Sequence, residues 1–124
     1  MNPTIWIILA AVVVALFALQ RMSFLSADKA RQFLRDGALV VDVRNPGEFS
    51  SGHVPNAINI PLGDLSARAS DRLRDKNQVL LLHCLSGTRS GIAGRQLKHM
   101  GYRNVFNLGS YGRAESIVRG AAKA

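Results

Sequence analysis

The chain has 124 residues, with 16 Lys and Arg against 8 Asp and Glu and a formal net charge of +8. Its one cysteine, Cys84, excludes an internal disulfide and the common cysteine zinc sites. The few aromatic residues are not interleaved with a basic stripe, which argues against a nucleic-acid partner despite the positive charge. The length suits one N-terminal apolar segment and one modest hydrophobic core.

An uninterrupted apolar run over residues 5–19 predicts a transmembrane helix at residues 3–20. As a helix the run spans roughly 22 Å, short of the ~30 Å hydrocarbon core, and Trp6 suits an interface. Residues 1–4 lack the basic residues of a signal peptide, and no clear cleavage site follows the run. We expect a retained anchor that binds membrane lipid. A cleaved signal and a buried or partner-binding helix are the alternatives.

Basic residues follow this run and set its expected orientation. They outnumber the acidic residues up to position 36 and comprise Arg21, Lys29, Arg31 and Arg35. The positive-inside rule places this side of the segment in the cytoplasm. We therefore expect a single-pass membrane protein whose remaining chain is cytoplasmic.

The rest of the chain alternates between helical and strand patterns. Ser26 can cap a helix over residues 27–36, weaker helical periodicity covers residues 62–73, and another helix ends near Met100. The expected buried face of this last helix consists of Ile92, Ala93, Leu97 and Met100. Short apolar runs predict buried parallel strands at residues 39–43, 57–60, 79–82 and 105–108. The alternation predicts an α/β fold, a parallel sheet flanked by helices, with residues 120–124 frayed.

The most informative segment runs from Cys84 to Arg89, between an apolar strand and a helix. A thiol there faces the loop N–H groups and the positive end of the helix, and both favour the nucleophilic thiolate. Hydrogen bonds to a charged acceptor contribute about 1.5–3 kcal/mol each, against about 0.3–1 kcal/mol for a helix terminus, so the loop amides should matter more. Gly87 permits a tight turn, and Arg89 offers a planar cation. The alternative is a buried, inert cysteine.

Three segments, in order, resemble rhodanese-type sulfurtransferases. The segment His83-Cys84-Leu85-Ser86-Gly87-Thr88-Arg89-Ser90 is similar to the active-site loop of that family. Val41-Asp42-Val43-Arg44, followed by Glu48-Phe49, resembles its first core strand, and Gly52-His53-Val54-Pro55 resembles the entry to its second. The likeness covers about residues 23–120. It departs from the family pattern where Ser110 replaces one glycine of a pair and Glu115 stands in place of a tryptophan.

The resemblance implies covalent sulfur transfer without a cofactor or a metal. Cys84 would attack the outer sulfur of a small anionic donor such as thiosulfate, release sulfite and hold a persulfide. Because the chain has no second cysteine, the acceptor would be an external thiol, cyanide or the cysteine of another protein. The substrate-binding loop would consist of Leu85, Ser86, Gly87, Thr88 and Arg89.

Asp42 and Arg44 lie where a strand ends, at the edge that lines the ligand crevice of open α/β sheets. They could orient the Cys84 loop or attract an anion. We expect Arg44 to pair with Asp42 or Glu48 and to act indirectly, because buried charges need partners. His83 adjoins Cys84 but should point the opposite way along a strand, so we interpret it as structural.

Two other functions remain open. A noncatalytic rhodanese-like module would recruit a partner to the membrane. Cysteine-dependent phosphatases share the thiolate-and-arginine chemistry, but their loop is one residue longer and their arginine would fall at position 90, which is Ser90. The shorter loop suits one sulfur atom better than a tetrahedral oxyanion, so phosphatase activity is disfavoured.

Overall fold

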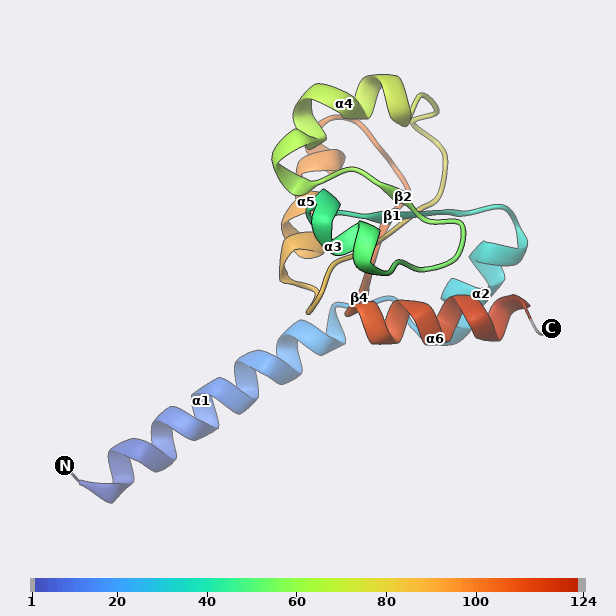
Figure 1. Ribbon diagram of the computed structural model, residues 1–124. Helices are drawn as coiled ribbons and strands as arrows, with labels where there is room; N and C mark the ends of the chain where they lie inside the picture. Colours follow the sequence, from blue (N-terminus) through green and yellow to red (C-terminus); the bar gives the residue numbers. More distant parts are fainter. Residues whose placement is uncertain (1, 123–124) are drawn as a thin grey trace.

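A four-stranded parallel sheet lies at the centre of the computed structural model, which describes residues 2–122. Helices cover both faces of the sheet, and one long helix projects away from it (Figure 1). In chain order the elements are α1 (Pro3–Met22), α2 (Ala27–Arg35), β1 (Leu39–Asp42), α3 (Pro46–Ser51), β2 (Ile58–Asn59), η1 (Leu62–Asp64), α4 (Leu65–Arg72), β3 (Leu80–His83), α5 (Thr88–His99), β4 (Val105–Gly109) and α6 (Tyr111–Ala122). The predicted α/β class and the apolar N-terminal helix are confirmed.

The strands lie in the order β2, β1, β3, β4, and every pairing is parallel. β1 and β3 pair in register, from Leu39 with Leu80 to Asp42 with His83. A register shift between β3 and β4 places His83 opposite Gly109. The carboxyl ends of these strands therefore meet at one edge, where open α/β sheets place their ligands.

Successive strand residues point to two hydrophobic clusters, one on each face of the sheet. The cluster beneath α4 and α5 includes Val41, Leu80, Leu82, Cys84 and Leu97. The cluster beneath α2 and α6 includes Val40, Leu81, Leu108, Ala114 and Ile117. Cys84 belongs to the first, whereas the ring of His83 lies 6.0 Å from that of Tyr111, which packs against the second. The expected opposite orientation of these neighbours is confirmed.

Local boundaries differ from the sequence expectations. The buried positions of α5 are Ser90, Ala93 and Leu97, whereas Ile92, expected on that face, is 42% exposed. The apolar pattern did not predict α3, a six-residue helix that begins with a proline and a capping box rather than a hydrophobic stripe. It also missed α6, which continues to Ala122, so the expected fraying is wrong for residues 120–122, and residues 123–124 lie outside the described chain.

A buried ion pair holds the turn after β1. Asp42 is fully buried and accepts hydrogen bonds of 2.7–3.0 Å from the backbone N–H, Nε and Nη2 of Arg44. Arg44 Nη2 also donates to the carbonyl of Gly52, and the Asn59 amide donates to the carbonyls of Asp42 and Arg44. Of the two predicted partners, Arg44 therefore pairs with Asp42, and the pair joins β1, β2 and the end of α3.

We predict that Asp42→Asn lowers the free energy of unfolding by about 3–5 kcal/mol, because it leaves the buried Arg44 guanidinium without its carboxylate. Chemical denaturation of the detergent-solubilised chain measures this loss. Asp71→Asn, which removes an exposed carboxylate, is the matched control and should change the free energy by less than about 0.5 kcal/mol. Equal effects of the two substitutions would contradict a structural role for the pair.

Candidate active site

The Cys84 loop connects the carboxyl end of β3 to the first turn of α5. Gly87, the residue before α5, has φ of 102°, a left-handed conformation that glycine adopts without steric cost. The ring of Phe24 packs against Gly87 and Gly109, and a Cβ built on Gly87 would lie 2.5 Å from that ring. Glycine is thus required at position 87 by the backbone and by the neighbouring ring.

Cys84 is 1% exposed, and its sulfur accepts a hydrogen bond of 3.0 Å from the Gly87 N–H. Burial raises the pKa of the thiol, but hydrogen bonds from the Ser90 backbone and hydroxyl, and from the Gly87 and Ser86 backbones, outweigh burial. The net result is a lowered pKa for Cys84. The loop therefore stabilises a thiolate at a position where burial alone would keep the thiol protonated.

The Ser90 hydroxyl has one proton and three acceptors within reach. It lies 3.6 Å from the Cys84 sulfur, 3.1 Å from the Gly87 carbonyl and 2.7 Å from Asn107 Oδ1. Asn107 in turn donates to the Gly87 carbonyl at 3.0 Å and accepts from the Gly109 N–H at 2.9 Å. Because Asn107 competes for the hydroxyl proton, the backbone N–H of Gly87 is the steadier donor to the sulfur.

From sequence alone, Asn107 has no expected role at this site, and Ser90 is included only as the last residue of the segment that resembles the active-site loop. Ser90 lies in the first turn of α5 and is fully buried. The signal for Asn107 was an amide that interrupts the apolar run at residues 105–108. A polar side chain in a buried strand needs a partner, and here the partner is the loop.

Arg89 forms a two-pronged ion pair with Glu48, with Nη1 to Oε1 at 2.7 Å and Nη2 to Oε2 at 3.1 Å. Asn45 and Glu48 form the capping box of α3, which fixes the carboxylate. The hydrogen bond from Arg89 is the main cause that lowers the pKa of Glu48 to about 2. The pKa of Arg89 is raised, first by Glu48 and then by Cys84. Glu48, considered from sequence only as a partner for Arg44, instead orients Arg89.

His83 links the Asp42 ion pair to the loop. It is fully buried, its Nδ1 lies 3.2 Å from the Cys84 carbonyl oxygen, and its Nε2 lies 3.7 Å from Asp42 Oδ2. Burial is the main cause that lowers the pKa of His83, so the ring is neutral near pH 7. Neither Asp42 nor Arg44 forms part of the loop itself. His83 lies between Asp42 and the Cys84 carbonyl.

The remaining loop side chains face outward. Leu85 is 59% exposed, and the hydroxyl oxygens of Ser86 and Thr88 lie 3.5 Å apart. Thr88 also accepts a hydrogen bond of 3.1 Å from Gln20 Nε2 at the end of α1. Among residues 2–122, no group of three or more His, Cys, Asp or Glu could hold a metal ion. The site offers a partly stabilised sulfur, backbone N–H donors and one guanidinium.

Comparisons with known proteins agree with this geometry. The sequence model of the rhodanese-like domain family matches residues 26–112. The chain is 41% identical over 69 residues to thiosulfate sulfurtransferase PspE of Escherichia coli (strain K12), a stretch that covers 56% of this chain and 66% of PspE. It is 36% identical over 112 residues to the protein YqhL of Bacillus subtilis (strain 168), and the alignment covers 86% of each.

A solved structure gives the same result. A rhodanese from E. coli, determined with anions, superposes with a TM-score of 0.60 at 36% identity and covers 62% of this chain and 91% of its own. The sheet order, the loop after β3 and the sequence match all point to one family. The chain belongs to the rhodanese-like domain family, which includes sulfurtransferases.

Proposed function

We propose that this protein is a membrane-anchored sulfurtransferase that moves sulfane sulfur through a persulfide on Cys84. The observation that carries the proposal is the Gly87 N–H directed at the Cys84 sulfur, in a loop that lowers the pKa of the thiol. The kinship with thiosulfate sulfurtransferase PspE supports thiosulfate as a donor.

In the first half-reaction, the Cys84 thiolate attacks the outer sulfur of thiosulfate. A new S–S bond forms on Cys84 as the S–S bond of thiosulfate breaks, and sulfite leaves with the bonding electron pair. The terminal sulfur of the persulfide retains a negative charge. The N–H groups of the loop and the guanidinium of Arg89 can stabilise that charge, as donors do at an oxyanion site.

In the second half-reaction, an external nucleophile attacks the terminal sulfur and Cys84 leaves as a thiolate. Cyanide would yield thiocyanate, and a small thiol or a protein cysteine would yield a new persulfide. The acceptor must be a separate molecule because Cys84 is the one cysteine of the chain. Two half-reactions of this kind give ping-pong kinetics.

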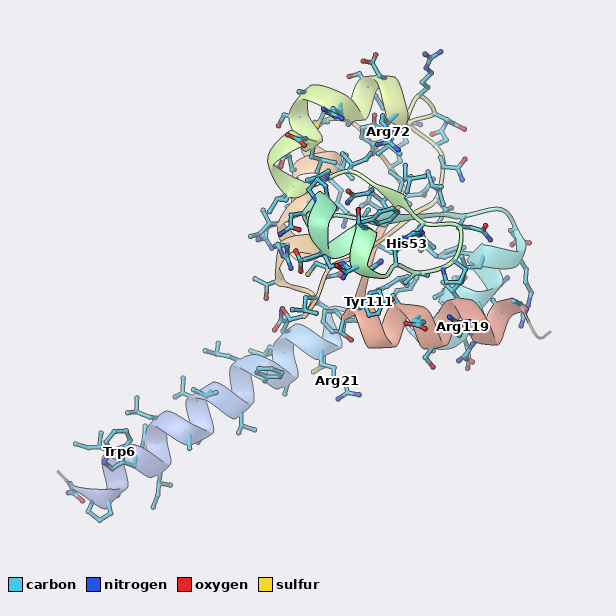
Figure 2. The ribbon with its side chains drawn as sticks, in the orientation of Figure 1. Trp6, Arg21, His53, Arg72, Tyr111 and Arg119 are labelled. Atoms are coloured by element: carbon cyan, nitrogen blue, oxygen red, sulfur yellow. The ribbon has the colours of Figure 1, made fainter. Side chains whose placement is uncertain are left out.

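The proposed domain organisation is a transmembrane segment at residues 3–20 and a rhodanese-like domain at residues 23–120. The N-terminal stretch contains an 18-residue window of mean hydropathy 2.3, and none of that window is buried. Figure 2 shows Trp6 near the free end of α1 and Arg21 at its domain end, as interfacial residues on opposite sides of a bilayer would lie. The basic residues that follow support a domain on the cytoplasmic side.

One observation favours the noncatalytic alternative. With 1% of Cys84 exposed, a donor reaches the sulfur only if the loop side chains move. A protein that kept this loop solely for packing and partner binding would have the same buried cysteine. The two functions differ in whether the sulfur becomes modified.

Treatment of the full chain with thiosulfate should add one sulfur atom to Cys84, and cyanide should then remove it. Intact-mass measurement and peptide mapping identify the adduct and its position. Cys84→Ser is the control and should gain nothing. A wild-type chain that stays unmodified after several sulfane-sulfur donors would favour the noncatalytic module, and hydrolysis of an aryl phosphate without any donor would favour a phosphatase.

Ser90→Ala should raise the pKa of the Cys84 thiol, because it removes one of the hydrogen-bond donors that offset burial. The rate of alkylation by iodoacetamide, measured from pH 5 to 10, should reach its half-maximum at higher pH than in the wild type. Ser116→Ala, at an exposed position of α6, is the control. An unchanged profile would assign the stabilisation of the thiolate to the backbone donors alone.

Arg89→Lys should lower kcat/KM for thiosulfate by about tenfold or more, because a lysine lacks the planar fork that Glu48 orients. Steady-state transfer of sulfur to cyanide measures the loss. Arg95→Lys, at an exposed position of the same helix, keeps the same chemical change away from the sulfur and should leave the rate unchanged. Near-normal turnover of Arg89→Lys would remove the guanidinium from the mechanism.

A further inference from the structure

A pocket lies at the junction between α1 and the rhodanese-like domain. Its volume is about 300 Å³, at the lower end of the range for small-ligand pockets. The last turns of α1 form one wall, and the loops after β3 and β4 together with the first turn of α6 form the other. The lining residues are Phe17, Gln20, Arg21, Phe24, Ser86, Ser110 and Arg113.

Hydrogen bonds connect the two walls of this junction pocket. Arg113 donates from Nη2 to the Leu25 carbonyl and from Nη1 to the Leu108 carbonyl, both at 2.6 Å. Its guanidinium lies 5.7 Å from the centre of the Phe24 ring. Leu25 N–H donates to the carbonyl of Asn107 at 2.9 Å. Together with the bond from Gln20 to Thr88, these contacts hold the end of α1 against the catalytic loop.

Two positive charges line the junction pocket without a compensating carboxylate. Neither Arg21 nor Arg113 forms an ion pair with an acidic side chain of residues 2–122. Burial and, after it, the positive charge of Arg21 lower the pKa of Arg113, a sign that the two cations repel. The hydroxyl groups of Ser86 and Ser110 add hydrogen-bond donors on the opposite wall. An anion placed here would gain donors and relieve the repulsion.

The position of the junction pocket along α1 indicates which chemical group is attached to the bound anion. The apolar run ends at Leu19, so Gln20 and Arg21 are the first polar residues after it. Phe17, about one turn earlier, is 70% exposed and would face acyl chains if α1 spans a bilayer. Figure 2 shows Arg21 at this end of α1, and the same pocket includes Arg113 of α6. A ligand that contacts both the arginines and Phe17 would need an anionic head and an apolar tail.

We propose that the junction pocket binds the phosphate of an anionic phospholipid, with Arg21 and Arg113 as the cationic contacts and Phe17 beside the acyl chains. This proposal rests on the proposed membrane anchoring of α1. The bound headgroup lies beside Ser86, two residues from Cys84. The lipid thus secures the end of the anchor against the catalytic loop.

The test compares phosphatidylglycerol with phosphatidylcholine on the full chain. The chain is purified in detergent with an equimolar mixture of the two lipids, and native mass spectrometry measures which lipid is retained. The wild type should retain phosphatidylglycerol in excess, and Arg21→Gln should lower that excess by about fivefold. Arg103→Gln, which removes an exposed charge just before β4 at the opposite edge of the sheet, should leave it unchanged.

Hydrogen exchange of the chain in nanodiscs gives an independent readout. Phosphatidylglycerol should slow exchange at residues 85–88 and 109–113 relative to phosphatidylcholine, and less so in Arg21→Gln. Inorganic phosphate at millimolar concentration should not reproduce this protection. Protection by phosphate alone would reassign the pocket to a soluble anion and overturn the lipid.

Two further outcomes would also overturn the proposal, and the measurements distinguish one from the other. Equal losses in Arg21→Gln and Arg103→Gln would mean diffuse attraction of the positive domain to anionic lipid, with no site. A chain that sediments with vesicles of neither composition would overturn both the anchoring and the lipid site. Neither result bears on the Cys84 persulfide, which the mass-spectrometric test with thiosulfate decides separately.

Discussion

The hydrogen bond from the Gly87 N–H to the Cys84 sulfur depends on a turn that brings three backbone segments together. Gly87 turns through a left-handed conformation, which directs its N–H back toward the sulfur. The ring of Phe24 fills the space over Gly87 and Gly109, and the Cys84 N–H donates to the Gly109 carbonyl at 3.3 Å. Without the hydrogen bonds that the loop donates to the sulfur, burial would leave Cys84 as an inert thiol. The turn therefore decides whether the position holds a nucleophile.

The positive charge of Arg89, beside the sulfur, is already paired with the carboxylate of Glu48. Glu48 remains ionised at any pH well above about 2, so it pairs with Arg89 throughout the physiological range. An incoming dianion must compete with that carboxylate for the guanidinium, whereas the backbone N–H groups have no such competitor. If Cys84 transfers sulfur as proposed, the amides hold the resting thiolate and Arg89 acts chiefly on the donor and the departing sulfite. The short helix α3, through its capping box, sets the direction of Arg89.

The sequence predicted the sheet, the position of Cys84 after a strand, and an ion pair of Arg44 with either Asp42 or Glu48, because strand periodicity, a single thiol and nearby opposite charges are local signals. It did not predict the partner of Arg89, since Glu48 lies 41 residues away and the contact exists only once α3 has folded against α5. Asn107 was missed for the same reason. Ile92 was misplaced because, at about 100° per residue, it lies roughly 100–160° around the helix from the buried Ser90, Ala93 and Leu97. Long-range contacts and helix phase thus account for the differences.

Phe24 joins α1 and the Cys84 loop in one structural unit. It lies between α1 and α2, before the residues that match the family model, yet its ring is what closes the turn at Gly87. The bond between Gln20 and Thr88 extends this contact into α1 itself. A helix attached in this way restricts how the domain can rotate relative to a membrane, unlike a helix joined by a free linker. If α1 spans a bilayer as proposed, the Cys84 loop would stay near its surface, where a membrane-bound acceptor would meet it at high local concentration.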